Sequence, residues 1–425
     1  MRVISFIENQ DVMKDPRDFM KTNRSSSPRK ITFFFSEESH FLAMQPVAQA
    51  AMARGYETDF SKDFQQPVEI GVYCNHKPDA TNARFSIVML HDLGQEQWPE
   101  CPSTEPNFWS LSPWNAFDIG ILPGRAWSEC WHSVSTLAGA RPRLGVFELG
   151  WPKADRVFRD RTAFSKEVAQ LRQTLQLKDR PSVLYAPSWE NDGKQDDFVR
   201  SLTHTPVNLL IKQYRWPDEI NQTRIREITA PYQGLAGDGI YVVDPGVDIM
   251  SVLALSDVLV SDESSCLIEA LLFEVPGIGV TDWPMPTVTW WDNQVPRFAE
   301  PPPCAIKTSR AELGIAVEHA LRSRGELLPR LRQHRDHYFS HLGQSSVLII
   351  DVIDAALTGA PWPVEPLLPK ALLRQLRGHE KVKLISSIGR RMRWEVRKLR
   401  WAAKAAMMRP AKAILLWIAS RFPWI

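Results

Sequence analysis

The sequence predicts an α/β fold with two Rossmann-like domains, each a parallel sheet flanked by helices. Short apolar runs of strand length alternate with helical segments along most of the chain. The 425 residues are too many for one compact core and enough for two such domains. With 44% hydrophobic and 24% charged residues, the composition is that of a globular protein. Because open parallel sheets bind ligands beyond the carboxyl ends of their strands, we expect a site in the cleft between the domains.

The first domain is expected over residues 29–150, after an N-terminal extension of residues 1–28. A turn over residues 36–40 should precede its first helix, and Gly55 is the expected C-cap of that helix. An aromatic and Pro-rich loop over residues 91–113 follows the third strand. The expected strands are 31–35, 68–73, 85–90, 118–122 and 143–149, and the expected helices are 41–54 and 128–138.

The second domain is expected over residues 151–325, after a break at residues 150–155. Closing helices over residues 326–360 and a Pro-rich linker into a basic tail, residues 361–425, complete the chain. The expected strands are 182–186, 207–211, 240–243, 258–260 and 277–280, and the expected helices are 162–175, 195–202, 249–255 and 266–273.

The polar turn between the strand 258–260 and the following helix predicts an anion site. Ser264 and Ser265 bring hydroxyls and backbone N–H groups to a helix N-terminus, where a phosphate is favoured. Asp262 belongs to the same turn, and Glu269 lies about one helical turn further on, so that it can face the same ligand. The alternative is a Ser-capped helix in an ordinary α/β domain.

His91 is the candidate general base. It ends an apolar strand and is followed by Asp92 and Gly94. An unperturbed imidazole pKa near about 6.5 suits proton transfer at neutral pH. Asp92 or another carboxylate could orient the ring, and Gly94 leaves room for a substrate. The alternative is a His that caps a loop.

Two further strand ends carry candidate donor-binding residues. Ser188 and Trp189 follow one strand of the second domain, and Trp189 could stack on a base or pack the domain interface. Lys212 ends the next strand, with Tyr214 just beyond it. A cation at that place could neutralise a diphosphate, and a solvated surface Lys is the alternative.

No metal or cofactor is expected. The sequence has no Asp-x-Asp pair, which metal-dependent nucleotide-sugar transferases commonly use, so the helix dipole and side-chain donors should stabilise a diphosphate. It also has no GxxxxGK[ST] phosphate loop and no GxSxG nucleophile elbow. Five cysteines without CxxC spacing indicate neither a zinc site nor a disulfide framework, which fits a reducing cytoplasm. Neither a signal-peptide apolar region nor a spanning apolar run is found.

The basic tail predicts a membrane surface as a partner. Residues 370–425 hold 15 Lys and Arg against 2 Asp and Glu, whereas the rest of the chain holds 36 against 47. Basic residues interleaved with Trp and Leu suit an anionic membrane surface. A nucleic-acid-binding arm and a solvated basic helix are the alternatives; the Trp- and Ile-rich end favours the membrane, so no nucleic acid is expected. The residues expected at the membrane are Arg390, Arg391, Arg393, Trp394, Arg397, Lys398, Arg400, Trp401 and Trp417.

Five segments follow one another in the order of a known family. They are Leu-His at 90–91 with Gly94, Gly-Trp-Pro-Lys-Ala-Asp at 150–155, Tyr-Ala-Pro-Ser-Trp at 185–189, Ser-Asp-Val-Leu-Val-Ser-Asp-Glu-Ser-Ser at 256–265 and Gly-Gln-Ser-Ser at 343–346. In this order the chain resembles the CDP-glycerol glycerophosphotransferases, the teichoic-acid polymerase and primase group with a GT-B fold. The resemblance covers roughly residues 85–355.

The resemblance implies a GT-B fold, with two Rossmann-like domains facing across a cleft. It implies transfer of a polyol phosphate from a CDP-linked donor to a hydroxyl of a surface polymer or lipid-linked primer. The place would be the cytoplasm, at the inner face of a bacterial cell membrane. His91 would take the acceptor proton. Ser264 and Ser265, with Lys212, would hold the diphosphate, and Glu269 would bind the ribose.

The sequence also departs from the family. His91 is followed by Asp92 instead of Gly, and the family's second His falls at Tyr214, so Lys212, Tyr214 or Arg215 must substitute or the activity is altered. Glu269 is also similar to the ribose-binding Glu of other GT-B enzymes. A glycosyltransferase using a UDP- or CDP-sugar therefore stays open, as does a catalytically degenerate protein that organises polymer synthesis.

Overall fold

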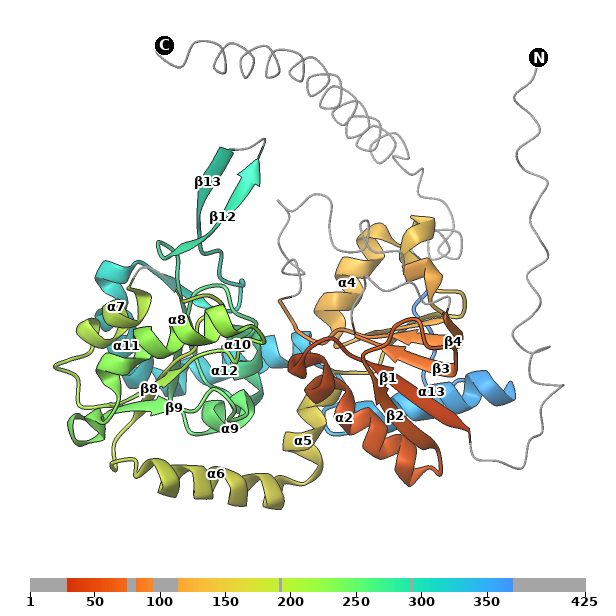
Figure 1. Ribbon diagram of the computed structural model, residues 1–425, viewed down its shortest axis with the longest axis horizontal. Helices are drawn as coiled ribbons and strands as arrows, with labels where there is room; N and C mark the ends of the chain where they lie inside the picture. Colours follow the sequence, from red (N-terminus) through yellow and green to blue (C-terminus); the bar gives the residue numbers. More distant parts are fainter. Residues whose placement is uncertain (1–28, 75–81, 95–113, 191–192, 291–292, 370–425) are drawn as a thin grey trace, which may run out of the picture. The chain divides into compact units, whose positions relative to one another are not determined.

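The computed structural model describes residues 29–74, 82–94, 114–190, 193–290 and 293–369 (Figure 1). The N-terminal extension, most of the aromatic loop 91–113 and the basic residues expected at the membrane lie outside these ranges. In the part that is described, no helix is long and apolar enough to cross a membrane.

The first half forms a six-stranded sheet in which each strand is parallel to its neighbours. On one face of the sheet, Ile31 and Phe33 pack in a core with helices α2 (Glu38–Ala53) and α13 (Ser345–Thr358). On the other face, Phe34 packs in a second core with α4 (Arg125–Val134). The sheet is therefore covered on both faces, which is why its central strands are apolar runs. In spatial order its strands are β2 (Glu57–Ser61), β1 (Lys30–Phe34), β3 (Val68–Tyr73), β4 (Ala83–Val88), β5 (Ile119–Leu122) and β6 (Gly145–Glu148).

The second half repeats this architecture with another parallel six-stranded sheet. Its strands in spatial order are β14 (Ile306–Thr308), β11 (Gly277–Val280), β10 (Val258–Ser261), β7 (Ser182–Tyr185), β8 (Asn208–Lys212) and β9 (Ile240–Val243). Its helices are α6 (Arg161–Leu175), α7 (Lys194–Ser201), α8 (Glu219–Thr229), α9 (Ile249–Ala254), α10 (Cys266–Glu269), η6 (Ala270–Phe273) and α11 (Leu313–Arg322). The hairpin of β12 (Pro284–Trp290) and β13 (Asn293–Phe298) extends away from this sheet in Figure 1. Two parallel sheets in sequence are the GT-B arrangement that we expected.

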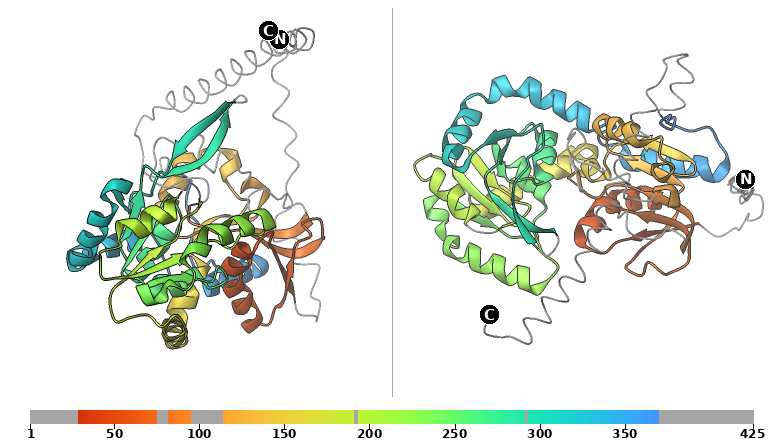
Figure 2. Two further views of the ribbon diagram at one scale, coloured as in Figure 1. Left: turned by 60° about the vertical axis from the view of Figure 1, so that its left-hand side comes forward. Right: turned by 90° about the horizontal axis from the view of Figure 1, so that it is seen from above.

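Two helices connect the halves. Helix α12 (Arg324–Tyr338) contacts α4 of the first half and η6 of the second (Figure 2). Helix α5 (Pro152–Arg159) carries Asp155, whose carboxylate accepts hydrogen bonds from the backbone N–H groups of Ser345 (3.1 Å) and Ser346 (2.7 Å). Gly150 has φ 90°, and a Cβ there would lie 2.2 Å from Oγ of Ser345. The family-like segments 150–155 and 343–346 therefore pack on each other at the start of α13.

Several elements differ from the sequence expectation. The expected break at 150–155 contains the start of α5, with Pro152 in the first turn, a position where Pro is well tolerated. Helix α2 begins at Glu38, inside the expected turn. Strand β2 and helix α8 were missed because both are mostly polar; α8 buries only Ile225 and Thr229. The hairpin was missed as well.

Candidate active site

His91 lies beyond β4, at the carboxyl end of the first sheet, and its tautomer is set by the neighbouring strand. Its Nδ1 is 2.9 Å from the carbonyl oxygen of Cys74, just after β3. Because a carbonyl can only accept, Nδ1 carries the proton and Nε2 keeps its lone pair. Burial lowers the pKa of His91, and the Asp92 carboxylate opposes this shift only in part. His91 is therefore a neutral base at neutral pH, with Nε2 as its basic atom.

Asp92 lies beside the basic nitrogen instead of orienting the ring. Its Oδ2 is 3.7 Å from Nε2 of His91, near enough to stabilise a proton taken up there. Its Oδ1 accepts a 2.6 Å hydrogen bond from the backbone N–H of Gly94, which closes the turn after His91. The orienting role that the sequence suggested for a carboxylate belongs to the carbonyl of Cys74.

Two residues that the sequence did not single out lie behind His91. His40 is buried, and its ring meets the ring of His91 edge to face with centroids 4.3 Å apart. The backbone N–H of Ser36 points at Nδ1 of His40 from 3.3 Å, so Nε2 carries the proton. That nitrogen lies 3.1 Å from Oε1 of Glu37 and donates to it. The only sequence signal was a Glu and a His three residues apart after an apolar strand.

The loop after β8 of the second domain reaches this same helix end. The hydroxyl of Tyr214 donates to Oε2 of Glu37 at 3.1 Å, and Nη1 of Arg215 lies 3.1 Å from both carboxylate oxygens of Glu38. Burial and the Glu37 carboxylate raise the pKa of Tyr214 to about 12, so its hydroxyl stays a donor. The carboxyl ends of the two sheets therefore meet at the N-terminus of α2.

The turn after β10 carries the candidate donor site. Oγ of Ser264 accepts from the backbone N–H that opens α10 at 3.3 Å, and Oγ of Ser265 donates to Oε1 of Glu269 at 3.2 Å. Glu269 is buried, and its Oε2 pairs with Nζ of Lys153 from α5 at 3.1 Å. Burial lowers the pKa of Lys153, but Glu269 and other carboxylates outweigh it and raise the pKa, so Lys153 is charged.

Lys212 is buried, which excludes the solvated alternative. Only 6% of it is exposed, and Nζ donates to the backbone carbonyls of Gln213 at 3.0 Å and Pro245 at 2.9 Å. Within the described ranges it pairs with no carboxylate. Burial, and to a smaller extent the positive charge of Lys153, lower the pKa of Lys212 to about 8. A buried ammonium without a carboxylate partner suits an incoming anion such as a diphosphate.

Asp262 and Ser188 connect two loops of the second domain, the loop after β7 and the turn after β10. Asp262 is fully buried, and its carboxylate accepts from the backbone N–H groups of Ser188 (2.8 Å) and Trp189 (3.2 Å). Nζ of Lys194 donates to the same carboxylate at 2.9 Å. Asp262 thus joins the loop after β7 to the turn after β10, with its oxygens occupied by protein donors.

Trp189 packs in an aromatic cluster. Its ring meets that of Trp216 edge to face at 5.0 Å, and Trp216 meets Tyr214 in the same way at 5.2 Å. The guanidinium of Arg224, a residue that the sequence did not single out, lies over the Trp189 ring at 4.4 Å. These contacts of Trp189 are with residues of its own domain, so stacking on a base stays a prediction, and the cluster leads from the loop after β7 to Tyr214.

Glu37, His40 and His91 bring three potential metal-ligand atoms within 4.8 Å of one another. The hydrogen bonds oppose metal binding here, because Nε2 of His40 carries the proton that it donates to Glu37, and a ligating nitrogen needs a lone pair. To bind a cation through Nε2, His40 would have to carry its proton on Nδ1 instead. That N–H would then face the backbone N–H of Ser36, so that two donors would point at each other. The arrangement fits a hydrogen-bonded base better than a metal centre.

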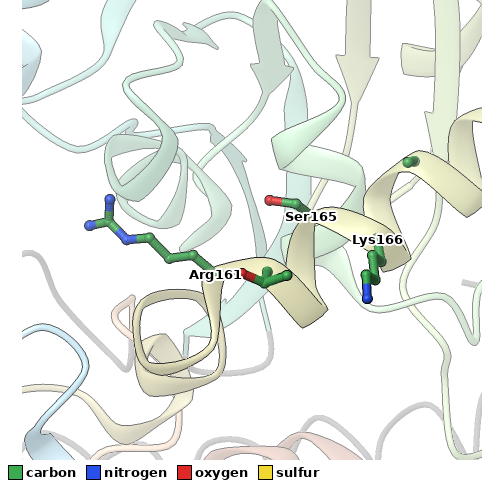
Figure 3. Close-up of a pocket in the computed structure, with 5 residues that line it drawn as sticks. Arg161, Ser165 and Lys166 are labelled. Atoms are coloured by element: carbon green, nitrogen blue, oxygen red, sulfur yellow. The ribbon is translucent and has the colours of Figure 1, made fainter.

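A shallow hollow along α6 contains none of the candidate residues (Figure 3). It is lined by Arg161, Thr162, Ser165, Lys166 and Ala169, all from one helix. It therefore lies apart from the chemistry described above.

The comparison with known proteins supports the fold. No family model and no curated protein matches the sequence. The solved structure of the wall teichoic acid polymerase TagF is similar, with 15% identity and a TM-score of 0.53 over 81% of this chain and 93% of that one. A histidine variant of TagF soaked with CDPG has 15% identity and a TM-score of 0.52 over the same shares. A putative UDP-N-acetylglucosamine 2-epimerase from Listeria monocytogenes has 12% identity and a TM-score of 0.48 over 80% and 100%. Together with the two parallel sheets, the likeness to TagF defines a GT-B fold.

Proposed function

We propose that the chain transfers a polyol phosphate from a CDP-linked donor, such as CDP-glycerol, to a hydroxyl of a surface polymer or its lipid-linked primer. One observation carries the proposal: a neutral His91 with a lone pair on Nε2 lies in one domain, and the other supplies a Ser-bearing turn and the buried cation Lys212. A base for the acceptor and an anion site for the donor are what such a transfer requires. The shared fold with TagF supports the choice of a polyol-phosphate donor.

In the proposed reaction, the acceptor oxygen attacks the phosphorus that carries the polyol. A new P–O bond forms, the P–O bond to CMP breaks, and Nε2 of His91 takes the acceptor proton. Asp92, 3.7 Å away, stabilises the resulting imidazolium. Ser264, Ser265 and Lys212 hold the diphosphate as charge grows on the leaving CMP, while Glu269 binds the ribose. Removal of a single donor of this kind typically costs on the order of 10²–10³ in rate.

Identification of the released nucleotide tests the proposal. The purified chain is incubated with membrane acceptor and with CDP-glycerol, CDP-ribitol or UDP-sugars in turn. Release of CMP from a CDP-polyol supports the proposal. Release of UDP, or of CDP from a CDP-sugar, would replace it with a GT-B glycosyltransferase. Nucleotide binding without turnover of any donor would indicate a protein that organises polymer synthesis.

A further inference from the structure

We propose that Tyr214 is a positioning residue of the second domain that holds the imidazole of His91 in place through Glu37 and His40. The inference rests on the proposed role of His91 as the acceptor base. It gives Tyr214 a function different from donor binding, and it adds two residues of the first domain to the site.

An unbroken series of contacts leads from Tyr214 to His91. The Tyr214 hydroxyl donates to one oxygen of Glu37 at 3.1 Å, and the other oxygen accepts from Nε2 of His40 at 3.1 Å. The ring of His40 then lies edge to face on the ring of His91, with centroids 4.3 Å apart. Apart from this packing, the His91 ring has one hydrogen bond, to the Cys74 carbonyl, and the 3.7 Å contact of its Nε2 with Asp92. A ring held by one hydrogen bond needs such packing to keep one orientation.

The groups around His91 come from four elements, and they have distinct effects. Asp92 follows His91 in the same loop, and the carbonyl that accepts from His91 is that of Cys74, just after β3. The thiol of Cys74 faces the backbone carbonyl of His40 at 3.8 Å. Glu37 and His40 come from the start of α2; Glu37 raises the pKa of His91 and His40 lowers it, although burial is the largest influence. Tyr214 comes from the second domain. The hydrogen bond from His40 lowers the pKa of Glu37 most strongly, burial opposes this by raising the pKa, and the Tyr214 hydroxyl lowers it by a smaller amount.

The position of Tyr214 in its loop joins the two halves of the site. It follows the buried Lys212 by two residues, so the end of β8 supplies the cation suited to the donor diphosphate and the loop directly after it supplies the bridge to Glu37. The same loop also offers a matched control. Arg215 contacts Glu38, the neighbour of Glu37, but that ion pair is largely exposed and does not reach His40. Exposed pairs of this kind contribute little to stability.

Imidazole NMR on the ligand-free full chain with isotope-labelled histidine tests the positioning directly. Loss of signals in His91→Ala and His40→Ala assigns the two rings. In Glu37→Gln the titration midpoint of His91 should fall, because an anion that favours the protonated ring is lost. In Tyr214→Phe, which keeps the ring beside Trp216, the His40 and His91 signals should shift or broaden. Arg215→Gln should leave both unchanged.

A kinetic measurement separates positioning from donor binding. With CDP-glycerol as the probe, Tyr214→Phe should lower kcat by roughly 2–30-fold with little change in KM, the range expected for coupling through a second residue. A rise in KM at constant kcat would overturn the inference and make Tyr214 a donor-binding residue.

Two other outcomes would also overturn the inference, and both are independent of the proposed function. One is an identical His40 and His91 titration in wild type, Tyr214→Phe and Glu37→Gln, with melting showing that all are folded. The other is a change of the His40 and His91 signals in Arg215→Gln as large as in Tyr214→Phe. Such a result would mean that any weakening of the contact between the domains disturbs His91, with no specific role for the Tyr214 hydroxyl. If CDP-glycerol is not turned over but the NMR coupling is present, the proposed function fails and the positioning of His91 stands.

Discussion

At the scale of single residues, one hydrogen bond decides what His91 can do. The carbonyl of Cys74 takes the proton on Nδ1 and leaves Nε2 basic. The sequence could indicate His91 because a His at the end of an apolar strand is visible in a single segment. It could not indicate His40 or Cys74, because their contacts with His91 join the segments after β3 and β4 to the start of α2, which only the folded domain brings together.

Replacement of His91 by Ala is expected to abolish transfer and leave the fold intact. In the wild type, burial lowers the pKa of His91, so the neutral base persists below the ordinary value of about 6.5. The rate should therefore be full above that lowered pKa and decline as pH falls through it. Turnover across pH and thermal melting check the prediction. His334→Ala is a matched control, because His334 of α12 also has a lowered pKa but lies outside the site. Turnover within tenfold of wild type with unchanged melting would remove His91 from the mechanism.

Glu269→Ala is expected to weaken nucleotide binding by roughly 1.5–3 kcal/mol, the range for hydrogen bonds to charged groups. Its carboxylate is buried between Ser265 and Lys153, at the turn that we propose as the donor site. Calorimetry with CMP and UMP measures the effect. The substitution removes a proposed ribose ligand and also leaves the buried Lys153 without its carboxylate partner. The double variant Glu269→Ala, Lys153→Met removes the unpaired charge as well, so any loss of affinity that remains is due to the missing carboxylate. Equal affinity for wild type and Glu269→Ala would mean that this helix does not face the ribose.

At the scale of elements, the apolar strands were predictable and the polar elements were not. Strands such as β3 and β11 are buried runs whose composition alone indicates them. Strand β2 at the sheet edge and helix α8 at the surface carry few apolar residues, so their structure depends on neighbours that the sequence does not show. The segment 150–155 resembled a linker, yet it opens α5, and its Asp155 holds the start of α13.

Asp155→Ala is expected to destabilise the chain, because two backbone N–H groups at the start of α13 lose a buried carboxylate acceptor. A loss of about 2 kcal/mol corresponds to a fall in Tm of roughly 4–8 °C for a domain of this size. Thermal melting measures it. Asp160→Ala is the matched control, since Asp160 accepts from the N–H of Ala163 at 2.9 Å at the start of α6, at the exposed surface. Equal shifts in Tm for the two variants would contradict the special role of Asp155.

At the scale of the whole molecule, the repeated alternation of strands and helices predicted two parallel sheets, and the structure has them. The contacts between the halves were beyond prediction. Lys153 with Glu269 and Tyr214 with Glu37 each join residues far apart in the sequence, and no local pattern reports such pairs. The family-like motifs indicated candidate loops, whereas the contacts between the halves determine which of their residues lie together.

Transfer is expected to need no metal. The absence of an Asp-x-Asp pair motivates this prediction, and the protonated Nε2 of His40 opposes a cation at the Glu37, His40 and His91 cluster. Dialysis against EDTA followed by a rate measurement should leave turnover unchanged. Activity that is lost in EDTA and returns only with Mg²⁺ or Mn²⁺ would contradict the prediction, and Glu37→Gln would then show whether this cluster holds the ion.

We further propose that the basic tail holds the chain at the inner face of the cell membrane, where a lipid-linked acceptor would be reached. The tail lies outside the described residues, so the argument is one of charge and composition. Its 15 Lys and Arg against 2 Asp and Glu are interleaved with Trp and Leu, and each basic residue near an anionic surface contributes roughly 1 kcal/mol. Deletion of residues 380–425 should release the chain from anionic liposomes and slow transfer to membrane acceptor, while nucleotide binding survives. Co-sedimentation at moderate salt, with neutral liposomes as the control, measures this. Equal co-sedimentation of the full-length and truncated chains would exclude the membrane role, and retention on nucleic acid instead of liposomes would assign the tail to that partner.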